Sequence, residues 1–264
     1  MDLKLEDKKA FISGSTAGIG YAIAKRFLVE GASVVINGRS EESVDKAIEE
    51  LKSETGSNKI TGIPADFSKV EEVDNLLKAL PEVDILINNA GIFEPKAFEA
   101  IPDEDWFRFF EVNVLSGIRL ARQYFPKMLE KNQGRIIFIS SESGVFIPDE
   151  MIHYGMTKTA QLAVARGLAE LTKGSNVTVN SILPGPTKSR GVGKFIEDLS
   201  ESSGKSIDKV EKEFFQDMRP TSLIQRFATV EEVADTVVYY SSTLASATNG
   251  AAIRVEGGLV KSIL

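Results

Sequence analysis

Short apolar runs alternate with longer amphipathic stretches from one end of this 264-residue sequence to the other. The apolar runs predict strands at residues 10–13, 33–37, 60–65, 83–88, 135–140, 177–183 and 251–255. The amphipathic stretches predict helices over residues 19–30, 41–54, 70–80, 103–130, 152–173 and 230–242. Strands that alternate with helices are joined by right-handed crossovers, so they form a mostly parallel sheet with helices on both faces.

One segment interrupts the alternation. Residues 187–227 are charged, rich in glycine and serine, and contain isolated phenylalanines such as Phe195 and Phe214. A connection of this length in a compact domain is typical of a lid or binding loop, and we expect short helices in it. We therefore predict one α/β domain over residues 1–264, a doubly wound parallel sheet of about seven strands with a lid insertion at about 187–227.

The composition excludes several classes of function. The formal net charge is −7 and the basic residues are scattered, so neither nucleic acid nor an anionic membrane is an expected partner. The chain has no cysteine and one histidine, His153, which argues against a metal centre built on these residues. No stretch approaches the roughly 18 apolar residues of a membrane span, and the charged N-terminus lacks the core of a signal peptide. We expect a metal-free cytoplasmic protein that acts on a small molecule.

A glycine-rich turn follows the first predicted strand and opens a helix. Its sequence is SGSTAGIG, residues 13–20. Glycines here let the backbone approach a pyrophosphate, whose charge is then met by free N–H groups at the helix N-terminus. Tight structural turns also use glycine, but the position after a first strand favours dinucleotide binding. The residues expected to bind the cofactor here are Gly14, Ser15, Thr16, Gly18, Ile19 and Gly20.

The end of the second predicted strand indicates which dinucleotide is bound. A carboxylate about 20 residues past the glycines normally binds the ribose 2′-hydroxyl of NAD, whereas an arginine accommodates the 2′-phosphate of NADP. Gly38 occupies the expected place of the acid, and Arg39 follows it. The sequence therefore favours NADP(H), with NAD(H) as the alternative.

Tyr154 and Lys158 stand four residues apart in a predicted helix, which places them on one face. Tyrosine ordinarily has a pKa of about 10, so acid/base work near neutrality needs a drop of roughly three units, or about 4 kcal/mol. A fixed lysine cation supplies such a bias. Ser141 lies at the end of a predicted strand, thirteen positions before Tyr154. The Tyr154 and Lys158 spacing alone also suits an ordinary surface helix, so its meaning depends on the rest of the chain.

Taken together, these motifs resemble the short-chain dehydrogenase/reductase family, and the resemblance covers essentially the whole chain. The matching elements, in order, are the SGSTAGIG turn, Asp66, the NNAG sequence at residues 88–91, Asn113, Ser141, Tyr154, Lys158, and Pro184 with Gly185. The resemblance implies a single Rossmann-type domain and an NAD(P)-dependent oxidoreductase acting on a carbonyl or secondary alcohol. Two small departures, Ser13 for threonine and Glu256 for aspartate, preserve the polar group.

The resemblance also implies roles for individual residues. Tyr154 exchanges the proton with the substrate oxygen, Lys158 lowers its pKa and binds the nicotinamide ribose, and Ser141 hydrogen-bonds the substrate oxygen. Asn113 helps to hold a water that leads protons to Lys158. His153 points elsewhere on the helix and suits a pocket-wall or packing role. On the cofactor, Asp66 and Phe67 meet the adenine, Asn89, Ala90 and Gly91 line the adenosine side, and Pro184, Gly185, Thr187 and Ser189 lie at the nicotinamide end.

Two other functions stay open at this point. A 3-oxoacyl-[acyl-carrier-protein] reductase would need a basic docking patch, for which Lys127, Lys131 and Lys173 are scattered candidates. A non-catalytic NADP(H)-binding sensor would have no need for Tyr154. The resemblance further implies a homo-oligomer, a tetramer or dimer, formed through the long helices 103–130 and 152–173.

Overall fold

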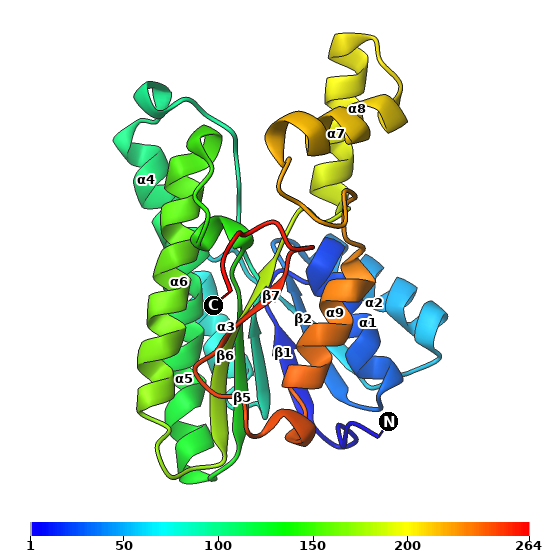
Figure 1. Cartoon of the computed structure of the whole chain (residues 1–264). Coiled ribbons are helices and arrows are strands. Elements are labelled where there is room, and N and C mark those ends of the chain that lie inside the picture. Colours follow the sequence, from blue (N-terminus) through cyan, green and yellow to red (C-terminus); the bar gives the residue numbers. More distant parts are fainter. Residues whose placement is uncertain (1, 264) are drawn as a thin grey trace.

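Seven parallel strands form one sheet in the order β3-β2-β1-β4-β5-β6-β7 in the computed structural model, which describes residues 2–263 except the side chains of Arg190 and Phe195 (Figure 1). The strands are β1 (Lys9–Ile12), β2 (Ser33–Gly38), β3 (Ile60–Pro64), β4 (Ile85–Asn88), β5 (Gly134–Ile139), β6 (Val177–Pro184) and β7 (Ala252–Val255). The predicted fold class and strand number are confirmed. Strands β4, β5 and β6 are buried along their whole length, as their apolar sequences require.

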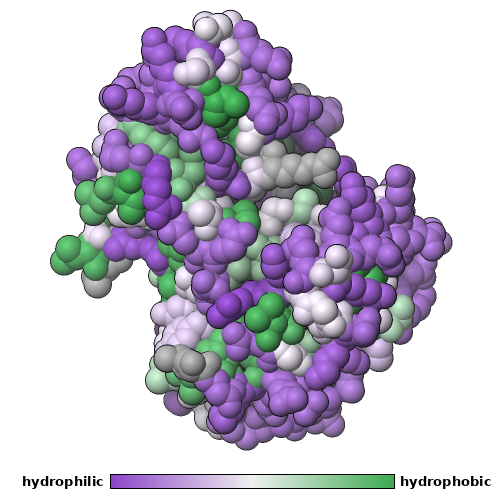
Figure 2. All heavy atoms as spheres, turned by 90° about the vertical axis from the view of Figure 1, so that its right-hand side faces the viewer, coloured by the Kyte–Doolittle hydropathy of each residue, from purple (hydrophilic) through white to green (hydrophobic). Residues whose placement is uncertain are grey.

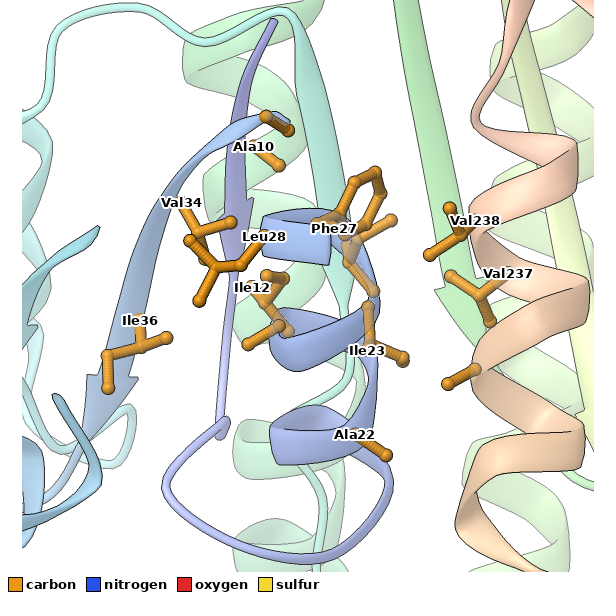
Figure 3. Close-up of a cluster of buried hydrophobic side chains, with 14 of the residues drawn as sticks. Ala10, Ile12, Ala22, Ile23, Phe27, Leu28, Val34, Ile36, Val237 and Val238 are labelled. Carbon is orange, nitrogen blue, oxygen red and sulfur yellow. The ribbon is translucent and has the colours of Figure 1, made fainter. Parts of the chain in front are cut away.

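Helices cover both faces of the sheet and bury two separate apolar clusters. On one face, α1 (Gly18–Val29), α2 (Glu41–Thr55) and α9 (Val230–Tyr240) pack on the sheet, and Figure 3 shows Phe27 of α1 and Val237 of α9 among the buried side chains. On the other face lie α3 (Val70–Ala79), α5 (Ser116–Glu130) and α6 (Ile152–Glu170). The helices therefore cover both faces of the sheet, while the edge strand β7 stays partly exposed.

The strand order reverses between β1 and β4, because β2 and β3 extend the sheet on one side of this pair while β5, β6 and β7 extend it on the other. In an open parallel sheet, such a switch point leaves a crevice at the carboxyl ends of the strands, where ligands bind. The glycine-rich turn, Arg39, Asp66, the NNAG segment and Ser141 come at or just after the carboxyl ends of strands, while Asn113 lies in the π-helical turn η2 (Glu111–Leu115) and Tyr154 and Lys158 lie in α6. The topology alone thus brings the first group to one edge of the sheet.

The predicted helix over 103–130 is present but not uniform. It consists of α4 (Asp103–Phe110), a π-helical turn η2 (Glu111–Leu115) and α5. A π turn is often found at functional sites, and this one contains Asn113. The amide of Asn113 is held by the backbone of Ile92 and by Thr157, so tertiary contacts accompany the departure from α geometry.

The segment 187–227, here called the lid segment, stands beyond the carboxyl ends of the strands (Figure 1, yellow to orange). It contains α7 (Arg190–Ser203), α8 (Ile207–Glu213) and a π-helical turn η5 (Phe214–Met218). A small cluster of its own, Ile196, Val210, Phe215 and Phe227, holds these pieces together. The expected short helices are therefore present.

Short 3-10 turns complete the chain: η1 (Phe98–Ala100), η3 (Glu142–Gly144), η4 (Asp149–Met151) and η6 (Thr243–Ala245). Within residues 2–263, no helix is both long enough and apolar enough to span a membrane.

Candidate active site

The glycine-rich turn has the geometry of an anion cradle. Gly14 and Gly18 adopt φ angles of 61° and 58°, which side-chain-bearing residues rarely adopt. A Cβ on Gly20 would lie 2.4 Å from the carbonyl oxygen of Gly14, so the turn closes only around glycine. No side chain caps the N-terminus of α1, and its first turn has no acidic residue. Free N–H groups and the absence of a competing carboxylate suit a bound phosphate group, so this turn fits a dinucleotide.

Polar side chains inside the turn hold its shape. Ser13 Oγ accepts hydrogen bonds of 2.9 Å from the N–H groups of both Asn89 and Ala90. The Asn89 amide donates in return to the carbonyl oxygens of Ser13 and Gly14. Ser15 is fully buried, with its hydroxyl donating to Ile12 and accepting from the N–H of Asn37. The side chain of Ser15 is thus used within the fold. Asn37, which sequence reasoning missed, also holds the turn, because its Oδ1 accepts a hydrogen bond from the N–H of Gly14.

The residues expected at the adenosine end lie at the carboxyl ends of β2 and β3. Burial raises the pKa of the Asp66 carboxyl, but hydrogen bonds from Ser68 and the nearby charges of Lys69 and Arg39 together lower it below its usual value. Arg39 itself is exposed. Phe67 differs from expectation, because its side chain is buried in the core. A Cβ on Gly38 would lie 2.5 Å from the Thr16 methyl group, so the position expected for an acidic residue has no room for one.

The segments at the nicotinamide end come together around the same crevice. A Cβ on Gly91 would be 3.5 Å from both Lys158 Nζ and Asn113 Oδ1, and one on Gly18 would be 3.5 Å from Ser189 Cβ. Thr187 donates its hydroxyl to the carbonyl of Gly185, while the Ser189 hydroxyl caps α7. The glycine turn, the NNAG segment and the start of the lid segment therefore meet beside α6.

Ser141, Tyr154 and Lys158 face one cavity of about 240 Å³. Ser141 lies two residues after the end of β5, and α6 supplies the other two. The Lys158 ammonium lies 5.6 Å from the centroid of the Tyr154 ring, and Phe93 meets that ring edge to face at 6.3 Å. The same cavity is also lined by Ile19, Asn89, Gly91, Pro184, Gly185, Thr187 and Ser189. Many of the predicted residues are thus brought together in one place.

Burial dominates the proton affinities of this pair. It raises the pKa of Tyr154, as does the charge of Glu142, while a hydrogen bond with Ser141 acts in the opposite direction. Burial lowers the pKa of Lys158 to about 8, and Glu142 opposes that change. The pKa of Tyr154 is therefore displaced in the direction opposite to that expected from a neighbouring cation.

A hydrogen-bonded chain supports Lys158 from behind. Its ammonium donates to the carbonyl of Ile139 at 2.9 Å and to Gln161 Oε1 at 3.3 Å. The Gln161 amide donates at 2.5 Å to the backbone carbonyl of Asn113. Asn113 was expected to connect with Lys158 through a water. In the structure the side chain of Gln161 bridges the two residues, because it contacts the Lys158 ammonium and the Asn113 carbonyl. Sequence reasoning missed Gln161, although its place one turn after Lys158 was a signal.

Three charged side chains on the cavity wall were also missed. Glu142, next to Ser141, is buried, and its Oε2 accepts a 2.5 Å hydrogen bond from the Ser141 hydroxyl. Arg219 of the lid segment places its Nε 3.9 Å from Glu142 and donates to Glu150 at 2.9 Å.

His153 is fully buried against Phe109, at a ring distance of 4.1 Å, as the expected packing role requires.

The remaining wall is mainly apolar, with contributions from Ile92, Phe93, Pro95, Met151, Val192, Phe214, Met218 and Phe227. Figure 2 shows a largely hydrophilic outer surface, with apolar residues gathered below the part of the molecule at the top of the view. An apolar cavity with a few convergent polar groups is typical of a small-molecule site. A dinucleotide cradle beside such a cavity defines the class of nucleotide-dependent oxidoreductases with a doubly wound sheet.

Comparisons with known proteins identify the family within this class. Residues 8–200 match the family model for short chain dehydrogenase. The chain is 51% identical to the uncharacterized oxidoreductase YvrD of Bacillus subtilis (strain 168), over all of both chains. It is 31% identical to the 3-oxoacyl-[acyl-carrier-protein] reductase FabG of Aquifex aeolicus, covering 98% of this chain and 100% of that protein. The structure of L-sorbose reductase from Gluconobacter frateurii, complexed with NADPH and L-sorbose, superposes with a TM-score of 0.92 at 30% identity over all of both chains.

The chain belongs to the short-chain dehydrogenase family. It is an oxidoreductase of the kind that uses a nicotinamide dinucleotide to interconvert carbonyl and alcohol groups.

Proposed function

We propose that this protein is an NADP(H)-dependent reductase of ketones, or dehydrogenase of secondary alcohols, in which Tyr154 exchanges the proton. The dinucleotide, when bound, supplies or accepts a hydride at the substrate carbon. Ser141 holds the substrate oxygen, and Tyr154 gives that oxygen its proton during reduction. Lys158, supported through Gln161 and Asn113, stabilises the charge left on the phenol.

One observation carries this proposal. Ser141 and Tyr154 come from different elements, yet both line one cavity beside the glycine turn, and a hydrogen bond links them. Lys158 lies beneath the Tyr154 ring. A serine hydroxyl and a phenol hydroxyl that can both donate to the same substrate oxygen stabilise the negative charge that develops on it. The lid segment supplies Phe214, Met218 and other wall residues, which supports its proposed role in covering the substrate.

The Tyr154→Phe variant tests the assignment of the acid. Removing the phenol oxygen is expected to lower kcat by about 10² to 10⁴, the usual contribution of acid/base catalysis, with NADPH affinity nearly unchanged. Turnover is followed by NADPH absorbance and binding by NADPH fluorescence. Tyr239→Phe on the outer face of α9 is the matched control and should keep full activity. Near-normal kcat in the Tyr154→Phe variant would refute the mechanism.

Arg39 supports the proposed preference for NADP(H). Its exposed guanidinium follows β2, and Gly38 leaves no room for the carboxylate that would bind the NAD ribose. Arg39→Ala should weaken NADPH binding by about tenfold to hundredfold, the range of a charge-assisted hydrogen bond, while NADH binding changes little. Equal losses for the two cofactors would show that Arg39 does not read the 2′-phosphate.

The thioester alternative keeps support from the relative named FabG. Comparing the rates for acetoacetyl thioesters with those for simple ketones distinguishes this alternative. The sensor would be favoured if the protein binds NADPH tightly but turns over no compound of a broad carbonyl panel.

A cytoplasmic homo-oligomer, tetramer or dimer, is also proposed. Exposed apolar residues on α4, above all Phe107 with 75% of its surface exposed, support a covered face there, and sedimentation analysis tests it.

A further inference from the structure

A line of charged side chains crosses the cavity from the catalytic serine to the lid segment. It begins at Ser141 Oγ, continues through the Glu142 carboxyl group at 2.5 Å, and reaches the Arg219 guanidinium at 3.9 Å. Arg219 then donates to Glu150 Oε1 at 2.9 Å. The side chains of Glu142 and Arg219 are 7% and 8% exposed, so these charges are almost fully withdrawn from water. Buried charges are costly unless each has a partner or a ligand, which makes this line an unusual feature of an otherwise apolar wall.

The balance of charge in this line restricts the substrate. One arginine faces two carboxyl groups, so no positive charge is left over, whether Glu142 is ionised or protonated. Burial raises the pKa of Glu142, and the Ser141 and Ser143 hydrogen bonds and the Arg219 charge oppose that rise. Among the described residues that line the cavity, the other cation is Lys158, which is already bound to Ile139 and Gln161. A substrate carboxylate would therefore meet Glu142 and Glu150 without a free cation to pair with.

The position of Glu142 indicates which group it binds. Its carboxyl oxygen lies within hydrogen-bond distance of Ser141 Oγ, the atom that holds the reacting carbonyl oxygen under the proposed function. In an α-hydroxyketone, the carbonyl and hydroxyl oxygens sit on adjacent carbons and are separated by a similar distance. A hydroxyl group is a donor, and a carboxyl oxygen is a strong acceptor for it. The substrate hydroxyl would also displace Ser141 from Glu142, which frees the serine hydroxyl to donate to the carbonyl oxygen.

We propose that Glu142, held by Arg219 and Glu150, is a specificity-determining residue that selects neutral α-hydroxyketones, and the corresponding vicinal diols in the reverse direction. This inference rests on the proposed carbonyl reductase function. In the reduction, the carbonyl carbon gains a hydride from the reduced cofactor and the carbonyl oxygen gains a proton from Tyr154, while the neighbouring hydroxyl group stays intact. The apolar walls from Phe93, Phe214 and Met218 contact the carbon skeleton of the substrate.

Four ketones of equal carbon number test the selection in the wild-type enzyme. Acetoin carries a hydroxyl next to the carbonyl, 4-hydroxy-2-butanone carries it one carbon further, 2-butanone lacks it, and acetoacetate carries a carboxylate. We expect kcat/KM for acetoin to exceed that for 2-butanone by about tenfold to hundredfold, the value of a hydrogen bond to a charged group. The value for 4-hydroxy-2-butanone should lie near 2-butanone, and acetoacetate should be lowest. L-sorbose and dihydroxyacetone, run beside acetoin, show whether sugar-like or acyloin-like hydroxyketones are preferred.

Two substitutions separate recognition from structural support. Glu142→Gln should lower the ratio of acetoin to 2-butanone kcat/KM by about tenfold, because a neutral acceptor replaces a charged one. Glu150→Gln releases Arg219 from its partner, so kcat/KM for acetoacetate should rise relative to wild type. Glu211→Gln is the matched control. Like Glu142 and Glu150, Glu211 pairs with a basic residue of the lid segment, in its case Lys188, but it does not line the cavity. NADPH affinity, measured for every variant, reports whether the fold is kept.

The outcomes are distinct. If wild-type protein binds NADPH but reduces none of the ketones or sugars, the proposed function itself fails. If kcat/KM for 2-butanone equals that for acetoin, or if kcat/KM is highest for acetoacetate, the carbonyl reductase function stands and the selection by Glu142 is overturned. The wild-type comparison decides the question even if Glu142→Gln does not fold.

Discussion

Gln161→Ala is expected to shift the alkaline limit of activity to lower pH. Lys158 acts in its charged form, so activity is present below its pKa and is lost as the pH rises through it. Burial lowers that pKa to about 8. Gln161 Oε1 accepts a hydrogen bond from the ammonium at 3.3 Å, which favours the charged form. Removing this acceptor must therefore lower the pKa of Lys158.

The size of the shift follows from the contact. A hydrogen bond to a charged group contributes about 1.5–3 kcal/mol, and the Lys158 to Gln161 contact is slightly longer than usual, so the lower value applies. One pKa unit corresponds to about 1.4 kcal/mol. We expect the falling limb of the kcat/KM profile to move by about one unit, from near pH 8 toward pH 7.

The assay is the pH dependence of kcat/KM, which reports ionisations of the free enzyme. Gln161→Glu places a negative acceptor at the same position, so its limb should move to higher pH. Gln123→Ala, on the outer side of α5, is the control and should leave the profile unchanged. An unmoved limb in Gln161→Ala, or shifts of the same sign in the Ala and Glu variants, would show that Gln161 does not govern the charge of Lys158.

Three further substitutions test the supporting structure. Gly20→Ala forces a Cβ to within 2.4 Å of the Gly14 carbonyl, so the free energy of unfolding should fall by about 1–3 kcal/mol and NADPH affinity should drop; unchanged affinity would contradict the cradle geometry. Ser13→Ala leaves the N–H groups of Asn89 and Ala90 without an acceptor, at a cost of about 1–3 kcal/mol in urea unfolding that Ser13→Thr should restore. Thr229→Ala breaks the capping box with Glu232 and should lower the same quantity by about 1 kcal/mol, while Thr229→Ser retains it.

The order of strands and helices could be predicted because the chain repeats one local pattern. Apolar runs located every strand, and the turn after β1 was identified by its glycines. Helix boundaries were less accurate: α6 ends at Glu170 and not at residue 173, and the helix over 103–130 contains a π turn. Periodicity cannot detect that turn, since it accompanies contacts of Asn113 with Ile92 and Thr157.

Individual roles within the site were harder to predict, because one residue type serves several purposes. Ser15 and Phe67 were expected on the cofactor, but the Ser15 hydroxyl is bound to Ile12 and Asn37, and the Phe67 side chain is buried in the core. Sequence reasoning also missed the Arg219 contacts, since Arg219 meets Glu142 only through the conformation of the lid segment. A charged residue directly after Ser141, in a run of small residues, was the one available signal for Glu142.

Glu142 connects substrate recognition with the proton chemistry of the site. Burial raises the pKa of Tyr154 and lowers that of Lys158, and the charge of an ionised Glu142 adds to the first change and opposes the second. Ionised Glu142 therefore favours a protonated phenol and a charged ammonium. Both states are those needed before a carbonyl is reduced, because Tyr154 must hold a proton to give. A substrate hydroxyl that binds Glu142 leaves its charge in place and releases Ser141 toward the carbonyl oxygen. The group proposed to select the substrate therefore also prepares the acid that protonates it.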